Sequence, residues 1–226
     1  MTTYIFTGGK LAVGSMDELG LHMSEADLII AADSGYNNAS RLGVRPGLLL
    51  GDLDSIDRGA LAPDELEHIE KIIVPAIKDD TDTQLAVDTA ISRGADEIYI
   101  IGGLGGRLDH TLSSVFLLEY IADRGAGAVM SDGQSRVRVM KTAGEPVTLL
   151  IPKTFDGENG FKYLSVVPLT DECEGVRISG VFYPLDGVTL KRSYSYAVSN
   201  EISSERAEIS LVRGTMLVIE SRDSNL

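Results

Sequence analysis

The sequence is short of cysteine, tryptophan, histidine and positive charge, and these shortages exclude several classes of protein. One cysteine, Cys173, rules out an intramolecular disulfide and argues against a thiolate metal site. With 20 Lys and Arg against 34 Asp and Glu, the net charge of −14 repels a phosphate backbone, so we expect no nucleic-acid partner. The histidines show no spacing typical of a Ser-His-Asp triad, and the acidic stretch around Cys173 disfavours a thiolate nucleophile. We therefore expect no covalent catalysis.

Long hydrophobic runs are also missing. No segment approaches the roughly 20 consecutive apolar residues that a membrane span needs, so we expect no membrane partner. Residues 1–9 contain neither a basic leader nor a long apolar region, and they resemble a first strand more than a signal peptide. A cytoplasmic location is the expectation that follows.

The composition that remains is ordinary for a globular protein, with 43% hydrophobic and 24% charged residues in a chain of 226. The first half alternates short aliphatic runs with segments of helical character. The runs predict strands over 4–7, 28–32, 48–50, 72–74, 98–101 and 128–130, and the segments predict helices over 35–42, 63–71, 82–93 and 111–124. This alternation is typical of a parallel sheet with helices on both faces.

After about residue 130, apolar residues recur at every second position, and turn pairs such as Asp186-Gly187 separate the runs. About seven short strands of this kind predict an antiparallel sandwich or barrel. The expected fold class is α/β: an N-terminal Rossmann-like domain with a parallel sheet over 1–130, followed by a C-terminal antiparallel β-sandwich domain over 131–226.

Acidic residues stand where the predicted strands end. Asp33 follows the second strand, Asp52 and Asp54 the third, Asp79 and Asp82 the fourth, and Asp109 the fifth. Ligands of an open parallel sheet bind beyond the carboxyl ends of its strands, so we expect these acids to converge on one pocket. Carboxylates at close range repel one another unless a divalent cation neutralises them, and Asp oxygens suit Mg²⁺. Asp52 and Asp54 project to the same side of an extended segment, so both can reach one metal ion.

Structural roles compete with this interpretation. Thr81 and Gln84 match a capping box, and Asp109 could cap the helix that follows it. Each acid alone is more often structural than catalytic, but acids at four strand ends together favour a site.

A glycine-rich segment, 102–106, follows the fifth predicted strand. Closely spaced glycines let backbone N–H groups approach phosphate oxygens. No Gly-Lys-Ser/Thr sequence of a Walker loop follows, and Leu108 stands where a dinucleotide fingerprint needs its third glycine. Arg107 offers a fork of donors that suits phosphate, or it pairs with Asp109, and the two roles can coexist.

Together these segments resemble the thiamine pyrophosphokinase family over nearly the whole chain. The blocks that carry the resemblance are 32–35, 51–55, 79–82 and 102–110 in the first half, and 180–185 and 198–201 in the second. Six blocks in the same order make a chance match improbable.

The resemblance implies an N-terminal domain that binds ATP and Mg²⁺, and a homodimer that holds thiamine between this domain and the partner's β-sandwich. It places the metal on Asp52, Asp54 and Asp82, and it adds Arg107 and Asp109 to these as catalytic residues. It places the nucleotide on Asp33, Asp79, Gly102, Gly103, Gly105, Gly106 and Arg107. It places thiamine on Asp79, Asp82, Tyr183, Ser199 and Asn200. Some members carry Trp near 183–185, whereas this chain has none, so Tyr183 or Phe182 either stacks on the pyrimidine or merely packs.

The implied reaction transfers the pyrophosphoryl group of ATP to thiamine and releases AMP. We expect the thiamine hydroxyl to attack the β-phosphorus directly, with Asp82 or Asp109 accepting the proton. Two other classes stay open: a glycosyltransferase with an Asp-x-Asp motif and a diphosphate donor, and a sensor that binds thiamine or nucleotide without turnover. The C-terminal domain could also serve only in dimerisation.

Overall fold

The structure is a computed structural model that describes residues 1–226 except 26, 53–67, 76–79, 143–144, 157–159 and 224–226. The chain divides into two compact units, Met1–Gly133 and Gln134–Leu226. No helix in the described ranges is long and apolar enough to cross a lipid bilayer.

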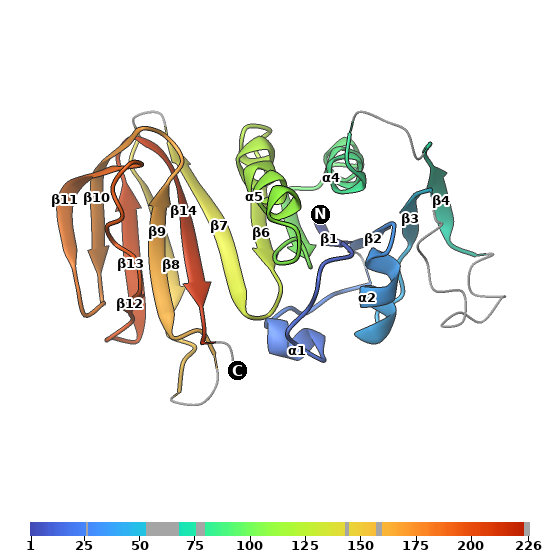
Figure 1. Cartoon of the computed structure of the whole chain (residues 1–226), viewed down its shortest axis with the longest axis horizontal. Helices are drawn as coiled ribbons and strands as arrows, with labels where there is room; N and C mark the ends of the chain where they lie inside the picture. Colours follow the sequence, from blue (N-terminus) through green and yellow to red (C-terminus); the bar gives the residue numbers. More distant parts are fainter. Residues whose placement is uncertain (26, 53–67, 76–79, 143–144, 157–159, 224–226) are drawn as a thin grey trace. The chain divides into compact units, whose positions relative to one another are not determined.

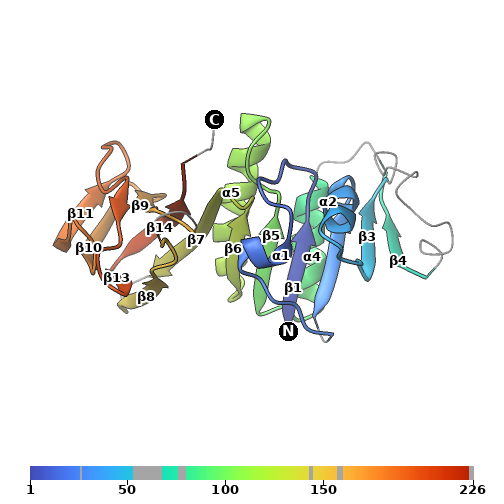
Figure 2. The ribbon, with the colours of Figure 1, turned by 90° about the horizontal axis from the view of Figure 1, so that it is seen from below.

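The first unit is built on a parallel sheet, which Figure 2 shows with its strands side by side. The strands lie in the order β6 (Gly127–Ser131), β5 (Glu97–Ile101), β1 (Thr2–Phe6), β2 (Leu28–Ala32), β3 (Leu48–Gly51) and β4 (Glu70–Ile73). Ile5 pairs with Ile30 on one side and Ile100 on the other, and none of these three side chains is exposed. Strands buried in this way need helices on both faces.

Helices cover both faces of this sheet (Figure 1). On one face, α1 (Met16–Leu19) and α2 (Gly35–Arg41) enclose a core that includes Tyr4, Phe6 and Ile101. On the other face, α4 (Asp82–Ser92) packs on β1, β2 and β3, and α5 (Leu108–Ala122) packs on β6. The α/β fold class expected from the alternating pattern is confirmed.

Two helix predictions were wrong in part. The predicted helix over 63–71 lies outside the described residues up to 67, and Glu70 and Lys71 belong to strand β4 instead. This strand pairs in parallel with β3 and has an exposed edge, so the charged residues there face solvent as they would on a helix. The second error is the start of α5, which begins at Leu108, three residues before the predicted position.

The second unit is a sandwich of two antiparallel sheets (Figure 1). One contains β12 (Asn200–Glu201), β9 (Tyr163–Pro168), β14 (Gly214–Ser221) and β7 (Ser135–Thr142). The other contains β11 (Leu185–Lys191), β10 (Glu172–Ser179), β13 (Arg206–Leu211) and β8 (Val147–Pro152). The expected β-sandwich is therefore confirmed.

Side chains from both sheets meet in one core. Val166 and Val218 come from the first sheet, and Val176 and Ile209 come from the second. Cys173 is buried in this core, its Sγ donates to the Thr215 carbonyl oxygen at 3.2 Å, and burial raises the pKa of its thiol.

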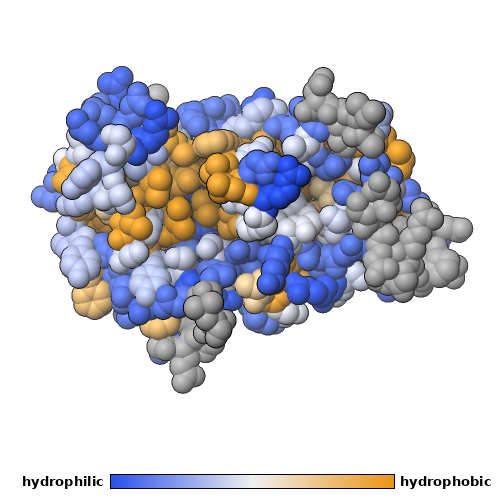
Figure 3. Space-filling model, viewed as in Figure 1, coloured by the Kyte–Doolittle hydropathy of each residue, from blue (hydrophilic) through white to orange (hydrophobic). Residues whose placement is uncertain are grey.

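The opposite face of the β7–β14–β9 sheet is also apolar. Val139, Leu217 and Val167 form one row across the three strands, and they alternate along the chain with the core-facing residues. Hydrophobic residues gather over these strands in the space-filling view (Figure 3). This sheet is therefore apolar on both of its faces, unlike a sheet that turns one face to water.

Candidate active site

The segments that follow β1, β2 and β5 are packed against one another through glycines. A Cβ on Gly9 would lie 1.9 Å from the carbonyl oxygen of Gly102, and a Cβ on Gly35 would lie 2.0 Å from that of Phe6. Only a residue without a side chain fits at such distances. The glycines therefore bring three strand ends together at the carboxyl edge of the sheet.

Asp33 joins the ends of β2 and β3. Its backbone N–H donates to the Leu50 carbonyl oxygen at 2.7 Å, and a Cβ on Gly51 would lie 3.2 Å from the Asp33 Cα. Asp33 has a φ of 48°, a left-handed conformation that is uncommon for a residue other than glycine. This contact places Asp33 beside the segment that carries Asp52, as the sequence predicted, and both residues are half-buried.

The glycine-rich segment after β5 consists of two parts with different surroundings. A Cβ on Gly102 would lie 2.9 Å from the Thr7 carbonyl oxygen, and a Cβ on Gly103 would lie 2.8 Å from the Met130 Sδ, so these two glycines serve packing. Gly105 and Gly106 are exposed, have φ values of 80° and 74°, and would meet nothing within 4 Å. The open part is therefore the part of this segment that a phosphate can approach.

Asn38 fixes the loop that follows β1. From helix α2, its Nδ2 donates to the carbonyl oxygens of Thr7 and Gly9, both at 2.7 Å. Arg41, one turn further along α2, donates to the Val13 carbonyl oxygen at 3.1 Å. Motif spacing did not reveal Asn38, but a residue with low helix propensity inside a predicted helix was the available signal.

Arg107 and Asp109 form the ion pair that the sequence offered as one of two roles for the arginine. Arg107 Nε donates to Asp109 Oδ1 at 3.1 Å, and its second contact, from Nη2 to Oδ2, is 2.6 Å long. The guanidinium and the His110 backbone N–H lower the pKa of Asp109 to about 2. Asp109 is not the N-cap of α5, because the helix begins one residue before it and Arg107 occupies the N-cap position.

Asp82 lies in the first turn of α4, half-buried, directly after the N-cap Thr81. The Thr81 hydroxyl accepts the backbone N–H of Gln84 at 3.1 Å, so the predicted cap is present next to the predicted site residue. A carboxylate in this position also interacts favourably with the positive end of the helix dipole.

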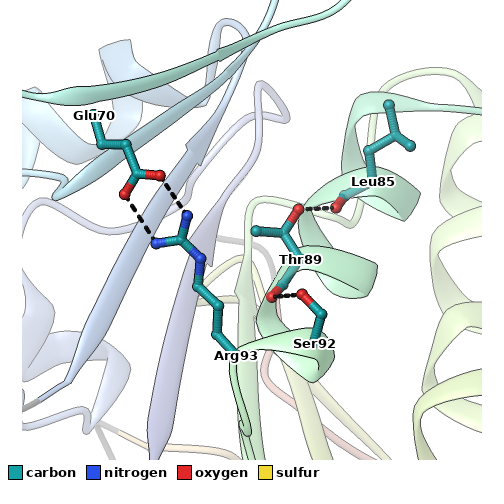
Figure 4. A network of polar contacts seen from close by, with 5 residues as sticks. All are labelled: Glu70, Leu85, Thr89, Ser92 and Arg93. Atoms are coloured by element: carbon teal, nitrogen blue, oxygen red, sulfur yellow. Dashed lines mark hydrogen bonds and ion pairs between the residues drawn. The ribbon is translucent and has the colours of Figure 1, made fainter.

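The other end of α4 is tied to the edge strand β4 (Figure 4). Both terminal nitrogens of Arg93 donate to Glu70, at 3.0 and 2.5 Å, and this contact lowers the pKa of the Glu70 carboxyl. In the same turns of α4, Ser92 Oγ donates to the Thr89 carbonyl oxygen at 2.8 Å. The Arg93–Glu70 pair thus links the end of the helix that carries Asp82 to the sheet.

Among the described residues, no group of three or more His, Cys, Asp or Glu side chains is placed to hold a metal ion. Two of the predicted site residues, Asp54 and Asp79, lie outside the described ranges. The part of the predicted metal set that is described, Asp52 and Asp82, supplies the hard carboxylate oxygens that Mg²⁺ prefers. The donor chemistry thus fits, and the three-carboxylate arrangement stays a prediction.

In the second unit, Asn200 contacts Tyr183, which lies 17 positions earlier in the chain, and Ser199 directly precedes Asn200. Tyr183 is 74% exposed and Ser199 is exposed, whereas Asn200 is only 5% exposed. Asn200 binds the backbone of Tyr183 on both sides: Oδ1 accepts its N–H at 3.0 Å, and Nδ2 donates to its carbonyl oxygen at 2.7 Å.

A second buried side chain, Ser165 on β9, was missed by sequence reasoning. Its Oγ accepts the backbone N–H of Ser199 at 2.9 Å. The only signal in the sequence that could have pointed to Ser165 was a serine within an otherwise apolar predicted strand. The described residues of this unit also expose Phe182, Tyr194 and Tyr196.

Two family models match the chain in sequence order. The thiamin pyrophosphokinase catalytic domain matches residues 19–130, and the thiamin pyrophosphokinase vitamin B1 binding domain matches residues 148–216. Together they span most of both units.

Individual relatives are similar over nearly their full length. A thiamine pyrophosphokinase of Bacillus subtilis (strain 168) is 28% identical over 229 residues, which cover 98% of this chain and 99% of the relative. A crystal structure of the Bacillus subtilis thiamine pyrophosphokinase has a TM-score of 0.84 at 26% identity, covering 99% of this chain and 100% of that one. The thiamin pyrophosphokinase of Geobacillus thermodenitrificans has a TM-score of 0.78 at 26% identity, with coverage of 100% and 99%.

Proposed function

The chain belongs to the thiamine pyrophosphokinase family and is a transferase, and we propose that it transfers the pyrophosphoryl group of ATP to the hydroxyl of thiamine. The products are thiamine diphosphate and AMP. The observation that carries this proposal is that models of both family domains match, one on each unit and in the family's order. The site geometry is consistent with it, because carboxylates and an open glycine loop share one edge of the parallel sheet.

Asp52, Asp54 and Asp82 are the proposed magnesium ligands. Bound Mg²⁺ would be held by these carboxylates and would neutralise the charge of the triphosphate. The protein's own contribution is to fix the carboxylates: Asp82 stands in a capped first turn, and Asp52 follows a strand that pairs on both sides. Asp33 and Asp79 belong to the same proposed site.

Arg107 and the backbone amides around Gly105 and Gly106 are proposed to hold the transferred phosphates. Their amides lie in exposed backbone with room around it, and Arg107 is held in place by Asp109. With a pKa of about 2, Asp109 is a weak proton acceptor, so its role is to orient Arg107.

Thiamine is assigned to Tyr183, Ser199 and Asn200 of the second unit, together with Asp79 and Asp82 of the first. Thiamine is a cation, and a chain with a net charge of −14 attracts it. The exposed ring of Tyr183 can cover an aromatic pyrimidine in the absence of any tryptophan in the chain.

A homodimer with shared sites is also proposed. Leu108, Leu112 and Phe116 recur every four residues on α5, and they are 70%, 47% and 55% exposed. Such an apolar stripe is typical of a surface that another protein covers. A second copy of the chain would cover it and would present its Tyr183 side to the first unit.

One assay tests the proposal. The purified chain, thiamine, ATP and Mg²⁺ should yield thiamine diphosphate and AMP in equal amounts, and omission of Mg²⁺ should abolish the reaction. Chromatography of the nucleotide separates the outcomes. Release of a nucleoside diphosphate would indicate a glycosyltransferase, and binding of both ligands without turnover would indicate a sensor.

A further inference from the structure

We propose that Asn200 and Ser165 are positioning residues for thiamine, which hold Tyr183 and Ser199 in place without binding the vitamin themselves. The inference rests on the proposed function, because it names what forms the vitamin side of that site. It changes the role of Asn200, from a ligand of the pyrimidine to a support for its neighbour.

Asn200 extends a backbone pairing by one residue. The segment 180–183 and the segment 200–204 pair through the Val181–Ile202 bridge, the Phe182 N–H to Glu201 carbonyl bond at 3.1 Å and the Ser203 N–H to Gly180 carbonyl bond at 2.9 Å. Beyond Phe182 the two main chains no longer pair. At Tyr183 the side-chain amide of Asn200 replaces the missing main-chain partner. Its oxygen and nitrogen bind the N–H and carbonyl of Tyr183 as a neighbouring strand would.

The hydrogen-bonding capacity of Asn200 is then largely used. Its Oδ1 accepts a second backbone N–H, from Glu201, at 3.0 Å, so both lone pairs are engaged. One Nδ2 hydrogen goes to the Tyr183 carbonyl, and the side chain is buried. A ligand can therefore gain little from Asn200 directly, whereas it can reach the exposed ring of Tyr183.

Ser165 holds the backbone of Ser199 in place in a similar way. Ser199 has a φ of 59°, a conformation that costs free energy for a residue with a side chain unless its surroundings impose it. The buried Ser165 hydroxyl, 8% exposed, accepts the Ser199 N–H and so stabilises this conformation. Two buried polar side chains thus fix two exposed residues.

Kinetics with matched variants form the first test. Asn200→Ala and Ser165→Ala should each raise the thiamine KM about tenfold, the loss expected from one or two hydrogen bonds, with kcat and the ATP KM nearly unchanged. Thr170→Ala is the control, because it removes a similar bond, in which the Thr215 N–H at the start of β14 donates to Thr170 Oγ1 at 3.1 Å. It should leave the thiamine KM unchanged.

A double-mutant cycle separates positioning from direct contact. If Asn200 acts through Tyr183, adding Asn200→Ala to Tyr183→Ala should raise the thiamine KM no further. If the two effects on the thiamine KM multiply, Asn200 binds the vitamin itself and the proposal is overturned.

A readout without turnover keeps the inference distinct from the proposed function. Because the chain has no tryptophan, Tyr183→Trp introduces a single tryptophan at the position that Asn200 holds, and it can be excited at wavelengths where tyrosine does not absorb. Its anisotropy in the free protein should fall when Asn200→Ala is added, and it should not change with Thr170→Ala. An unchanged anisotropy would overturn the inference even in a fully active enzyme, whereas failure of the thiamine assay alone would overturn only the proposed function.

Discussion

Arg107 and Asp109 depend on each other at the scale of single residues. The pKa of Asp109 lies at about 2, below its ordinary value of 3.8, chiefly because Arg107 donates to the ionised carboxylate. A carboxyl with a lowered pKa in the folded state adds stability at pH values above its ordinary pKa, and this contribution disappears as the pH falls through about 2. The pair is therefore complete over the whole physiological range.

Arg107→Gln should raise the Asp109 pKa from about 2 toward its ordinary value of 3.8, because the largest cause of its depression is removed while the His110 N–H bond remains. Carbon-detected NMR of the Asp109 carboxyl during a pH titration measures both values. The titration of Asp96, whose pKa the N-terminal amine lowers, serves as the internal reference that should not move. Equal titration midpoints for Asp109 in the natural protein and in Arg107→Gln would show that Arg107 does not lower the Asp109 pKa.

Asp54→Asn should lower turnover at least about 100-fold, equivalent to about 2.7 kcal/mol of barrier, if Asp54 ligates the metal. Steady-state rates across a Mg²⁺ titration measure it, and part of the loss should be recovered at high Mg²⁺. Asp96→Asn is the control, since this exposed carboxylate precedes β5 and pairs with the N-terminal amine. Normal turnover of Asp54→Asn at limiting Mg²⁺ would remove Asp54 from the metal site.

Residue types could be predicted better than residue partners. The acids were found because their chemistry and their places after strands are visible in the sequence. Asn38 and Ser165 were not, because each binds the backbone of a residue about 30 positions away, and nothing in a local pattern says which carbonyl or N–H will be there. Long-range side-chain-to-backbone contacts need the fold first.

At the scale of elements, α2 holds the loop after β1 through Asn38. Asn38→Asp keeps the shape but turns an oxygen toward the carbonyls of Thr7 and Gly9 in place of a donor. We expect a loss of about 3 kcal/mol in the free energy of unfolding, because two backbone acceptors lose their partner. Urea denaturation with a common m-value measures it, and Ser40→Ala on the same helix should change the midpoint little. An unchanged midpoint for Asn38→Asp would contradict the idea that the Asn38 hydrogen bonds stabilise the loop after β1.

Element prediction succeeded where periodicity was strong and failed at an edge. The strand β2 has the predicted bounds, 28–32, since an uninterrupted aliphatic run has few alternatives. The error at Glu70 and Lys71 arose because an edge strand exposes its charges, and exposed charges look alike on strands and helices. The four-residue helix α1, capped by Ser15 and ended by Gly20 with a φ of 66°, was too short for periodicity to indicate.

At the scale of the whole molecule, shared sites would make two damaged chains complement each other. Chains with Asp54→Asn and chains with Tyr183→Ala, co-expressed and assayed at low thiamine, should recover roughly a quarter of the wild-type activity. Half of the dimers would then be mixed, and each mixed dimer would have one intact site of two. The pair Asp52→Asn and Asp54→Asn should recover nothing, because both lesions lie in the first unit. If the first mixture also stays inactive, each subunit has a self-contained site.

The change of pattern near residue 130 shows why the fold class was accessible from sequence. Parallel strands buried on both faces need continuous aliphatic runs, whereas sandwich strands alternate, and the two rules give visibly different sequences. The distances within the site were not accessible, because they depend on glycines such as Gly9 and Gly102 that let backbones approach in the folded chain.

The burial of Cys173 has a practical consequence for spectroscopy. Maleimide and nitroxide reagents react with exposed thiolates. The Cys173 thiol is buried, donates a hydrogen bond to the Thr215 carbonyl oxygen, and has a pKa raised by burial. The natural sequence can therefore serve directly as the background for labelling. A surface change such as Ser193→Cys would carry the probe alone, and electron-spin distances between two such probes could measure the geometry of an assembled pair in solution.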